Sequence, residues 1–482
     1  MIFFLLKTPI FQPKFCIIGA GFAGLRAARH FEQLGADYLL LEGSDRVGGR
    51  VYPFEYQNGF LHFGAEYVNG FDNEIYGIVE KLDLLDKFEP RTADLWMLDE
   101  GTVTVVDGKQ VDGETLKTFH EFVKSLNETL YLESQKSKAF RKSVDSKIDE
   151  NLDNSSIPDR DLFRKLCGIY KNYFQTEWSS PVQELSLSNL SLWDDGTDDE
   201  DSAVLNEYGF QKILEEFKSK IPKDKIRLNS KVININSENP DVKICLESGE
   251  ILNFDAVIVT SSLGFLKAHH RSLFTPQLPR DKQEVIEKMG FGNNLKVFME
   301  YETPWWSQDT STIMITSEGK MNDFMVFQPS NWAENILTCW IAGSGPSLVA
   351  QLSDSELKNL LDAHLKHNLK SFHVESSVRI YRKNWISDEY ALGSYSYLTP
   401  GQHGTEDIQT LGEPVIGEEG RLVVVQWVNR YAQATLSIKS YRPLVCFAGE
   451  HTDPTMYQTT VGAARSGMRE AVRIMKAYFP CE

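Results

Sequence analysis

The sequence predicts an α/β protein, α+β overall, with two lobes: a doubly wound domain of the Rossmann type and a second domain inserted into it. Three observations lead to this prediction. A strand–glycine turn–helix–strand unit stands near the N-terminus, between residues 15 and 42. Buried apolar strands of the same kind recur at residues 255–260 and 444–450. The chain has 482 residues, which is too many for one hydrophobic core.

The N-terminal unit carries the signature of a dinucleotide site. The apolar run 15–18 predicts a buried strand, and Gly19, Ala20, Gly21 and Gly24 follow it as a G-x-G-x-x-G turn. Such glycines allow a tight turn, a close approach to a pyrophosphate, and close packing of helix on strand. Residues 38–41 predict the second strand, and Glu42 follows 18 residues after Gly24, where a carboxylate can accept ribose hydroxyls. On the helix between the strands, the pattern predicts a buried stripe that runs from Gly24 to Leu34.

A second glycine turn follows Glu42 and distinguishes FAD from NAD as the cofactor. Arg46, Gly48, Gly49 and Arg50 complete the pattern E-x-x-x-R-x-G-G-R that begins at Glu42. This arrangement resembles the flavin-containing amine oxidase family. The resemblance implies the two-lobed fold of that family, FAD as the cofactor, and Arg50 alongside the pyrophosphate and ribityl chain.

The segment 59–70 extends the resemblance, with two departures. In the polyamine oxidase branch it commonly reads G-A-x-W-[IV]-[HE]-G and runs behind the flavin, which implies cofactor contacts for Gly64, Ala65, Glu66 and Tyr67. Tyr67 replaces the Trp and retains an aromatic wall. Asn69 replaces the His or Glu that contacts substrate, so this chain lacks the titratable group at that position.

Two further segments resemble the flavin motifs of the family. F-A-G-E, ending at Glu450, and the helix opening T-x-x-G-A at residues 459–463 imply cofactor contacts for Glu450, Thr460 and Val461. Thr459 stands where monoamine oxidases have a Tyr, and it resembles the spermine/polyamine oxidase branch as a substrate contact. Val232 resembles the residue that packs on the adenine.

The remaining site residues come from the middle of the chain. A Lys at the head of an apolar strand is usually a solvated end, but F-G-x-x-x-K-[IV]-F-[LM]-E resembles the place where these enzymes keep a buried Lys. The resemblance therefore implies that Lys296 is catalytic and holds a water against flavin N5. It also implies that Trp385 borders the cofactor and that Tyr395 contacts substrate at the flavin face. Ser394 replaces the Cys that bonds FAD covalently in monoamine oxidases, so we expect non-covalent FAD.

The resemblance implies an oxidase of polyamines such as spermine, spermidine or their N-acetyl forms. Hydride passes from the carbon alpha to nitrogen to flavin N5, the imine hydrolyses to an aldehyde, and O2 reoxidises the flavin and gives H2O2. We expect an FAD-binding domain at residues 12–72, 203–290 and 420–482, and a substrate-binding domain at 73–202 and 291–419.

Three alternatives stay open. One is a histone-demethylase-like amine oxidase, although the helical module and coiled-coil insertion of those enzymes are missing here. A second is a monoamine-oxidase-like or phytoene-desaturase-like enzyme, opposed by Ser394 and Lys296 respectively. The third is a flavoprotein fold kept for binding or as a scaffold with weak catalysis, which the departures at Tyr67, Asn69 and residues 206–207 motivate.

Composition limits the possible partners. The net charge is −18, which argues against nucleic acid as a ligand and suits a cationic substrate. The six cysteines form no C-x-x-C, and we expect no bound metal. No apolar run is long enough to span a membrane, and residues 1–6 do not form a signal peptide. We expect a cytoplasmic protein that is a monomer or a weak homodimer.

The periodicity of the remaining chain predicts the second lobe. Residues 72–200 predict a helical insertion, with a polar loop or exposed helix at 136–154 and an acidic loop at 193–202. Residues 226–235 predict one strand. The apolar runs at 297–299, 325–327 and 337–341 predict a second, largely antiparallel sheet beneath the substrate site.

Overall fold

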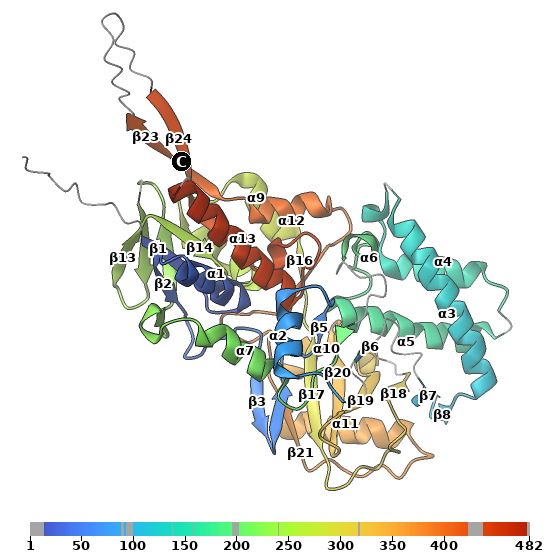
Figure 1. The fold of residues 1–482 in the computed structure, drawn as a ribbon. Helices are drawn as coiled ribbons and strands as arrows, with labels where there is room; N and C mark the ends of the chain where they lie inside the picture. The colour runs from blue at the N-terminus through green and yellow to red at the C-terminus, as the bar shows by residue number, and fades with distance from the viewer. Residues whose placement is uncertain are drawn as a thin grey trace, which may run out of the picture.

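The computed structural model describes residues 14–87, 91–92, 100–136, 138–157, 159–194, 202–239, 241–316, 319–422 and 437–479. The N-terminal residues 1–6 and most of the acidic loop expected at 193–202 lie outside these ranges. The fold places a parallel sheet with its helices beside a second, mostly antiparallel sheet, and a group of helices stands at one side (Figure 1).

The first sheet contains the N-terminal unit. Its strands, in spatial order, are β10 (Ile226–Arg227), β2 (Asp37–Leu41), β1 (Lys14–Ile18), β14 (Ala256–Val259), β24 (Ser437–Phe447) and β23 (Val415–Leu422). The first five are parallel and β23 is antiparallel to β24. β1 and β14 have no charged residue after Lys14 because they are covered on both faces, as parallel strands usually are. The sheet thus joins segments from both ends and the middle of the chain.

Two long helices pack together on one face of this sheet (Figure 1). They are α1 (Phe22–Gln33) and α13 (Thr460–Tyr478). Their close approach needs Gly467, because a Cβ there would lie 2.0 Å from the carbonyl oxygen of Ala23. The predicted stripe on α1 is wrong at its end: Leu34 is 53% exposed because it lies beyond the last helical residue. Arg26 on the same helix is also buried, and it forms an ion pair with Glu74.

A second sheet forms the floor of the other lobe. Its order is β21 (Arg379–Arg382), β17 (Leu295–Glu300), β20 (Ile336–Ile341), β19 (Val326–Pro329), β18 (Thr312–Ile315), β7 (Thr102–Val106) and β8 (Lys109–Gln110). Most neighbours are antiparallel, and β18 and β7 are parallel. This confirms the predicted strands at 297–299, 325–327 and 337–341. The predicted helical insertion at 72–200 is wrong at residues 102–106, since β7 supplies an apolar strand from that segment to this sheet.

Helices from the same segment stand at the side of this sheet (Figure 1). They are α3 (Gly113–Ser134), α4 (Val144–Asn154), α5 (Arg160–Trp178) and the short α6 (Asn189–Leu192). The end of the polar stretch 136–154 is the helix α4, which buries Val144, Ile148 and Leu152 along one face. α3, α4 and α5 share a hydrophobic core that also reaches β18 and β19.

The predicted strand at 226–235 is wrong as a single element. The structure divides it into β10 and β11 (Val232–Asn236), which belong to different sheets. Asn229, with a φ of 51°, makes the turn between them. β11 joins a smaller sheet with β13 (Ile251–Phe254), β12 (Val242–Leu246) and β15 (Phe274–Thr275).

Short elements complete the fold. The remaining helices are α2 (Glu74–Leu82), α7 (Gly209–Ser219), α8 (Leu263–Leu273), α9 (Arg280–Lys288), α10 (Gly345–Val349), α11 (Asp354–Asn368) and α12 (Thr405–Gly412). The remaining strands are β3 (Pro53–Tyr56) with β4 (Gly59–His62), β5 (Val68–Asn69) with β9 (Ser202–Ala203) and β6 (Arg91–Thr92), and β16 (Gly290–Phe291) with β22 (Ser396–Tyr397). In the described part of the chain, no helix has both the length and the apolar character to cross a bilayer.

The expected division into two domains and its boundaries stay a prediction. β23 begins at Val415, a few residues before the expected boundary at 420, and pairs within the first sheet.

Candidate active site

A cavity of about 500 Å³ runs from the glycine turn after β1 to the helices α3 and α5. Residues from both sheets line it, and most of the predicted site residues are among them: Gly19, Gly21, Glu42, Arg46, Gly49, Arg50, Gly64, Ala65, Glu66, Tyr67, Asn69, Val232, Lys296, Trp385, Tyr395, Glu450, Thr459 and Thr460. Ala20, Gly24 and Val461 do not line it. The structure thus brings together side chains that are hundreds of residues apart in the sequence.

At one end of the cavity, the glycine turn and Glu42 are locked together. One carboxylate oxygen of Glu42 accepts from the backbone N–H of Ala20 at 2.6 Å, and the other accepts from Ser44 N–H and Oγ at 2.9 and 2.8 Å. Gly24 packs against the turn, since a Cβ there would lie 1.9 Å from the carbonyl oxygen of Gly19. Ala20 and Gly24 therefore shape this end of the cavity from behind.

The second glycine turn is attached to the first. Gly48 donates to the carbonyl oxygen of Ala20 at 2.8 Å. The Arg46 guanidinium donates to the carbonyl oxygens of Val47 and Val51 at 3.2 and 3.1 Å and lies 4.0 Å from the ring centroid of Tyr52. Arg46 thus holds the turn in shape, and its predicted contact with a cofactor stays a prediction.

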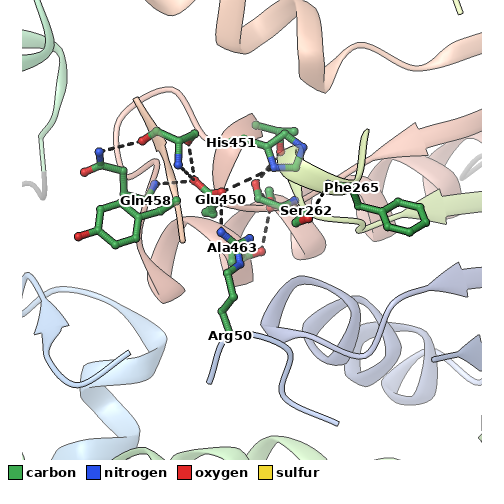
Figure 2. Close-up of polar contacts among 12 residues, drawn as sticks. Arg50, Ser262, Phe265, Glu450, His451, Gln458 and Ala463 are labelled. Carbon is green, nitrogen blue, oxygen red and sulfur yellow. Dashed lines mark hydrogen bonds and ion pairs between the residues drawn. The ribbon is translucent and has the colours of Figure 1, made fainter. Parts of the chain in front are cut away.

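Arg50 reaches Glu450 across the site (Figure 2). Glu450, shortly after the strand β24, is buried and accepts from Arg50 Nη1 at 2.9 Å, Ser396 Oγ at 2.6 Å and the backbone N–H of Gln458 at 3.0 Å. Burial alone would raise the pKa of Glu450, but the Arg50 charge and these donors hold it below its ordinary value. Glu450 is therefore a fixed anion.

His451 is buried beside this pair (Figure 2). Its Nδ1 lies 3.9 Å from Glu450 Oε1 and is too far away for a hydrogen bond. Burial lowers the pKa of His451 to about 4, and the Glu450 carboxylate only partly opposes this effect. His451 is therefore neutral at pH 7.

The first turn of α13 faces the same space. The Thr459 hydroxyl caps the helix, accepting from Gly462 N–H at 2.9 Å and donating to the carbonyl oxygen of Met456 at 2.8 Å. Thr460 lines the cavity, and its Oγ1 is buried with no partner among the described residues. Val461 lies behind them, against a smaller pocket next to α2. Thr459 thus has a structural task, and its predicted contact with substrate stays a prediction.

Lys296 and Glu66 form the central ion pair of the site. Lys296 Nζ donates to Glu66 Oε2 at 2.6 Å and to the carbonyl oxygen of Gly64 at 2.8 Å. The Lys296 side chain is 4% exposed and that of Glu66 is 33% exposed. Burial lowers the pKa of Lys296, and the Glu66 carboxylate acts in the opposite direction. Lys296 is thus buried, as the resemblance implied, but the partner that it shows is a carboxylate.

Aromatic rings surround this pair. Lys296 Nζ lies 5.2 Å from the ring centroid of Trp340, its neighbour across the sheet. The Tyr395 hydroxyl donates to the carbonyl oxygen of Thr176 and accepts from Asn294 Nδ2, both at 2.9 Å, and burial raises its pKa. Trp385 is buried and donates through Nε1 to the carbonyl oxygen of Phe63 at 3.0 Å. These bonds fix the rings that line the cavity.

The other two predicted positions lie farther along the wall. Asn69 Nδ2 donates to Ser202 Oγ at 3.0 Å, and both residues line the cavity. Val232 is buried at the start of β11, close in the sequence to Ser230 and Lys231, which also line the cavity. Asn69 is thus a polar wall residue, and its role in binding substrate stays a prediction.

The sequence reasoning missed several lining residues: Asn127, Tyr131, Tyr173, Glu177, Asn294 and Trp340. Tyr131 lies near the end of α3 and Glu177 near the end of α5, so no local motif marks them. Trp340 could have been found only from the register that pairs it with Lys296. These residues depend on the packing of separate elements.

The residues at the glycine end fit an adenine dinucleotide. A Cβ on Gly21 would meet nothing within 4 Å, so the backbone there borders open space, as close approach to a phosphate requires. The unpartnered Thr460 Oγ1 and the N-terminus of α13 face the same cavity. Glu42, Arg50 and Glu450 would hold the ribose and ribityl parts. Within the described ranges, no group of three His, Cys, Asp or Glu side chains could hold a metal ion.

Comparisons with known proteins agree with this arrangement. A family model described as flavin containing amine oxidoreductase matches residues 22–475. A peroxisomal N(1)-acetyl-spermine/spermidine oxidase from Bos taurus is 26% identical over 518 residues, with 98% of this chain and 97% of the relative covered. A probable polyamine oxidase 5 from Arabidopsis thaliana is 24% identical, with 97% and 99% covered. A lysine-specific histone demethylase 1B homolog from Caenorhabditis elegans is 25% identical, with 96% of this chain but 56% of the relative covered.

Proposed function

This chain belongs to the flavin-containing amine oxidoreductase family, an enzyme family that uses a flavin, and on that premise we propose that it oxidises polyamines with non-covalently bound FAD. The observation that carries the proposal is the Lys296–Glu66 pair, which lies in the same cavity as the dinucleotide end. When bound, the flavin supplies two-electron oxidation of a C–N bond and returns the electrons to O2 as H2O2.

The chamber beyond the cofactor end suits a long cationic chain. Rings of Tyr131, Tyr173, Trp340 and Tyr395 line it, and aromatic faces attract cations. Carboxylates of Glu66 and Glu177 line it as well. The net charge of −18 favours the approach of a cation. Spermine, spermidine and their N-acetyl forms have this chemistry, and two of the relatives are named for polyamine oxidation.

The chain's own residues would prepare the substrate for oxidation. Tyr395 and Trp340 would keep water from the reacting carbon, because their rings are fixed by hydrogen bonds or by cross-strand packing. Lys296 would hold a water or proton at its Nζ, which has three hydrogens and uses two of them for Gly64 and Glu66. The imine product would then be hydrolysed to an aldehyde.

Non-covalent attachment rests on Ser394. It takes the place of a cysteine, and its Oγ donates to the carbonyl oxygen of Asn294 at 3.0 Å. A hydroxyl in this position forms no thioether. A cytoplasmic location and a monomeric or weakly dimeric state belong to the same proposal, which includes neither nucleic acid nor membrane as a partner.

Anaerobic flavin absorbance tests the function. We expect the purified protein to be yellow, to bleach with spermine or N-acetylspermine but not with benzylamine, and to regain its colour in air with release of H2O2. Acid precipitation should release the flavin into the supernatant. Bleaching by benzylamine alone would favour a monoamine oxidase. A flavin that no amine bleaches would favour a binding protein and overturn the proposal.

A further inference from the structure

Glu66 has an unusual position for a carboxylate in an ion pair. It lies in the segment between β4 and β5, and one of its oxygens, Oε2, accepts from the buried Lys296. The side chain is one-third exposed and lines the cavity. Across the described ranges, the other oxygen, Oε1, accepts no hydrogen bond. A carboxylate can accept several hydrogen bonds, so Glu66 retains a free acceptor at the cavity wall.

Lys296 keeps Glu66 at this place. Its ammonium is also held by the carbonyl oxygen of Gly64 and lies over the ring of Trp340, and the residue is buried. Leaving Lys296 without its carboxylate would strand a buried charge, which costs several kcal/mol in general. The ion pair therefore fixes the orientation of Glu66 as well as that of Lys296.

The groups around Glu66 suit an amine. Trp340 and Tyr395 supply aromatic faces, and Asn69 with Ser202 supplies a polar wall. Asn69 itself carries no charge, although it replaces a His or Glu of the polyamine oxidase branch. The nearby cavity contains one further carboxylate, that of Glu177 on α5, which is exposed.

We infer that Glu66 binds the reacting amine of the substrate through the oxygen that Lys296 leaves open. This inference rests on the proposed function and names the group that recognises the substrate. Glu66 thereby supplies the charged contact that Asn69 cannot supply.

The partnership with Lys296 explains how such a contact is compatible with oxidation. An amine must be neutral before the carbon next to it gives up a hydride, and a lone carboxylate would hold the amine in its charged form. The charge of Lys296 offsets the charge of Glu66, so the pair as a whole is neutral. Glu66 can then accept a hydrogen bond from the amine without strongly favouring the ammonium.

Binding of a diamine tests the inference. The probes are 1,8-diaminooctane and its uncharged analogue 1,8-octanediol, titrated calorimetrically and without O2 into the flavin-loaded protein. We expect Glu66→Gln to weaken the diamine about tenfold, the effect of losing one charged hydrogen bond, and to leave the diol unchanged. Glu128→Gln on α3 makes the same change in net charge outside the cavity lining and should alter neither.

The Lys296→Met variant distinguishes a binding role from a purely structural one. It leaves the carboxylate uncompensated, so we expect the diamine to bind at least as tightly as in the unmodified protein. The double variant Glu66→Gln/Lys296→Met has no buried charge to disturb folding, and it should bind the diamine at least tenfold more weakly than Lys296→Met alone. Equal weakening by both single variants, or no difference between Lys296→Met and the double variant, would overturn the inference.

The same proteins separate this inference from the proposed function. If spermine bleaches the unmodified protein and Glu66→Gln binds the diamine normally, the function stands and the role of Glu66 is wrong. If spermine does not bleach the flavin and the unmodified protein binds no diamine, both are wrong.

Discussion

The two ends of the cavity are built in different ways. At the cofactor end, the two carboxylates are already engaged with the protein: Glu42 accepts three hydrogen bonds, and Glu450 is held by Arg50, Ser396 and Gln458. At the chamber end, Glu66 has one oxygen in use and one free. The first arrangement gives a rigid surface shaped mainly by backbone. The second leaves polar atoms available to a substrate that binds and dissociates in each turnover.

The two ends also differ in how chain segments contribute. The cofactor end takes twelve of its lining residues from the single stretch 19–50 and two from the start of α13. The chamber takes four residues from α5, two from α3, and one each from β5, β17 and β20. A single substitution at the cofactor end should therefore act by changing the shape of the backbone. A substitution in the chamber should act by removing a side-chain contact with the ligand.

The largest effect is expected for Gly24→Ala at the cofactor end. Its Cβ would lie 1.9 Å from the carbonyl oxygen of Gly19, so the turn must move away from the helix. We expect the purified variant to retain less than about a tenth of the flavin, because a misplaced turn no longer follows the pyrophosphate. The ratio of flavin to protein absorbance measures this loss.

Gly168→Ala is the matched control for that substitution. Gly168 is inside α5, and a Cβ there meets nothing within 4 Å. We expect full flavin content and a gain of up to about 1 kcal/mol in the free energy of unfolding, since alanine is the better helix former. Normal flavin content in Gly24→Ala would show that the turn is more tolerant than its packing indicates.

The sequence predicted the cofactor end better than the chamber, because the cofactor end draws on one continuous stretch of the chain. The glycines, the strands and Glu42 follow one another in a local order that can be read from the sequence. The pattern from Glu42 to Arg50 then identified the second glycine turn. Lys296 was different: its position at the head of a strand suggested a solvated end, and only the resemblance implied burial. Its partnership with Glu66 links residues 230 positions apart, and no local pattern encodes it.

The predicted boundaries of strands were wrong where pairing with distant strands determines them. Residues 226–235 were predicted as one strand, yet they divide between two sheets at Asn229. Residues 102–106 became a strand because the edge of the second sheet pairs with them. In both cases the deciding hydrogen bonds are made by residues distant in the sequence.

An effect of intermediate size is expected from pH, through two buried histidines, His451 beside the Arg50–Glu450 pair and His62 at the end of β4. Burial lowers the pKa of His451 to about 4 and that of His62 to about 3. The Glu450 carboxylate opposes the effect on His451, whereas the Lys296 charge adds to the effect on His62. Unfolding frees both rings to take up protons near their ordinary value of 6.5, so the unfolded state binds more protons between about pH 4 and 6.5.

The free energy of unfolding should therefore fall as the pH drops through this window, by about 3 kcal/mol for each histidine between pH 6.5 and pH 4. Denaturant titrations at several pH values measure the slope. His451→Leu and His62→Leu should each flatten it. His373→Gln, at a side chain that is 94% exposed, should leave it unchanged. An unchanged slope in both leucine variants would show that neither ring is buried in its neutral form.

The smallest effect is expected for Thr459, which tests whether a residue at the border of the two ends serves the fold or the ligand. Thr459→Ala removes the cap of α13 and should lower the free energy of unfolding by about 1 kcal/mol, whereas Thr459→Ser should restore most of it. Denaturant unfolding gives both values, and titration with 1,8-diaminooctane gives the affinity for an amine. Because the hydroxyl already donates its one proton to Met456 and accepts from Gly462, we expect the diamine to bind Thr459→Ala within about twofold of the unmodified protein. A much larger loss of affinity at unchanged stability would reverse the assignment, since it would mean that the hydroxyl exchanges its helix-capping bonds for the substrate.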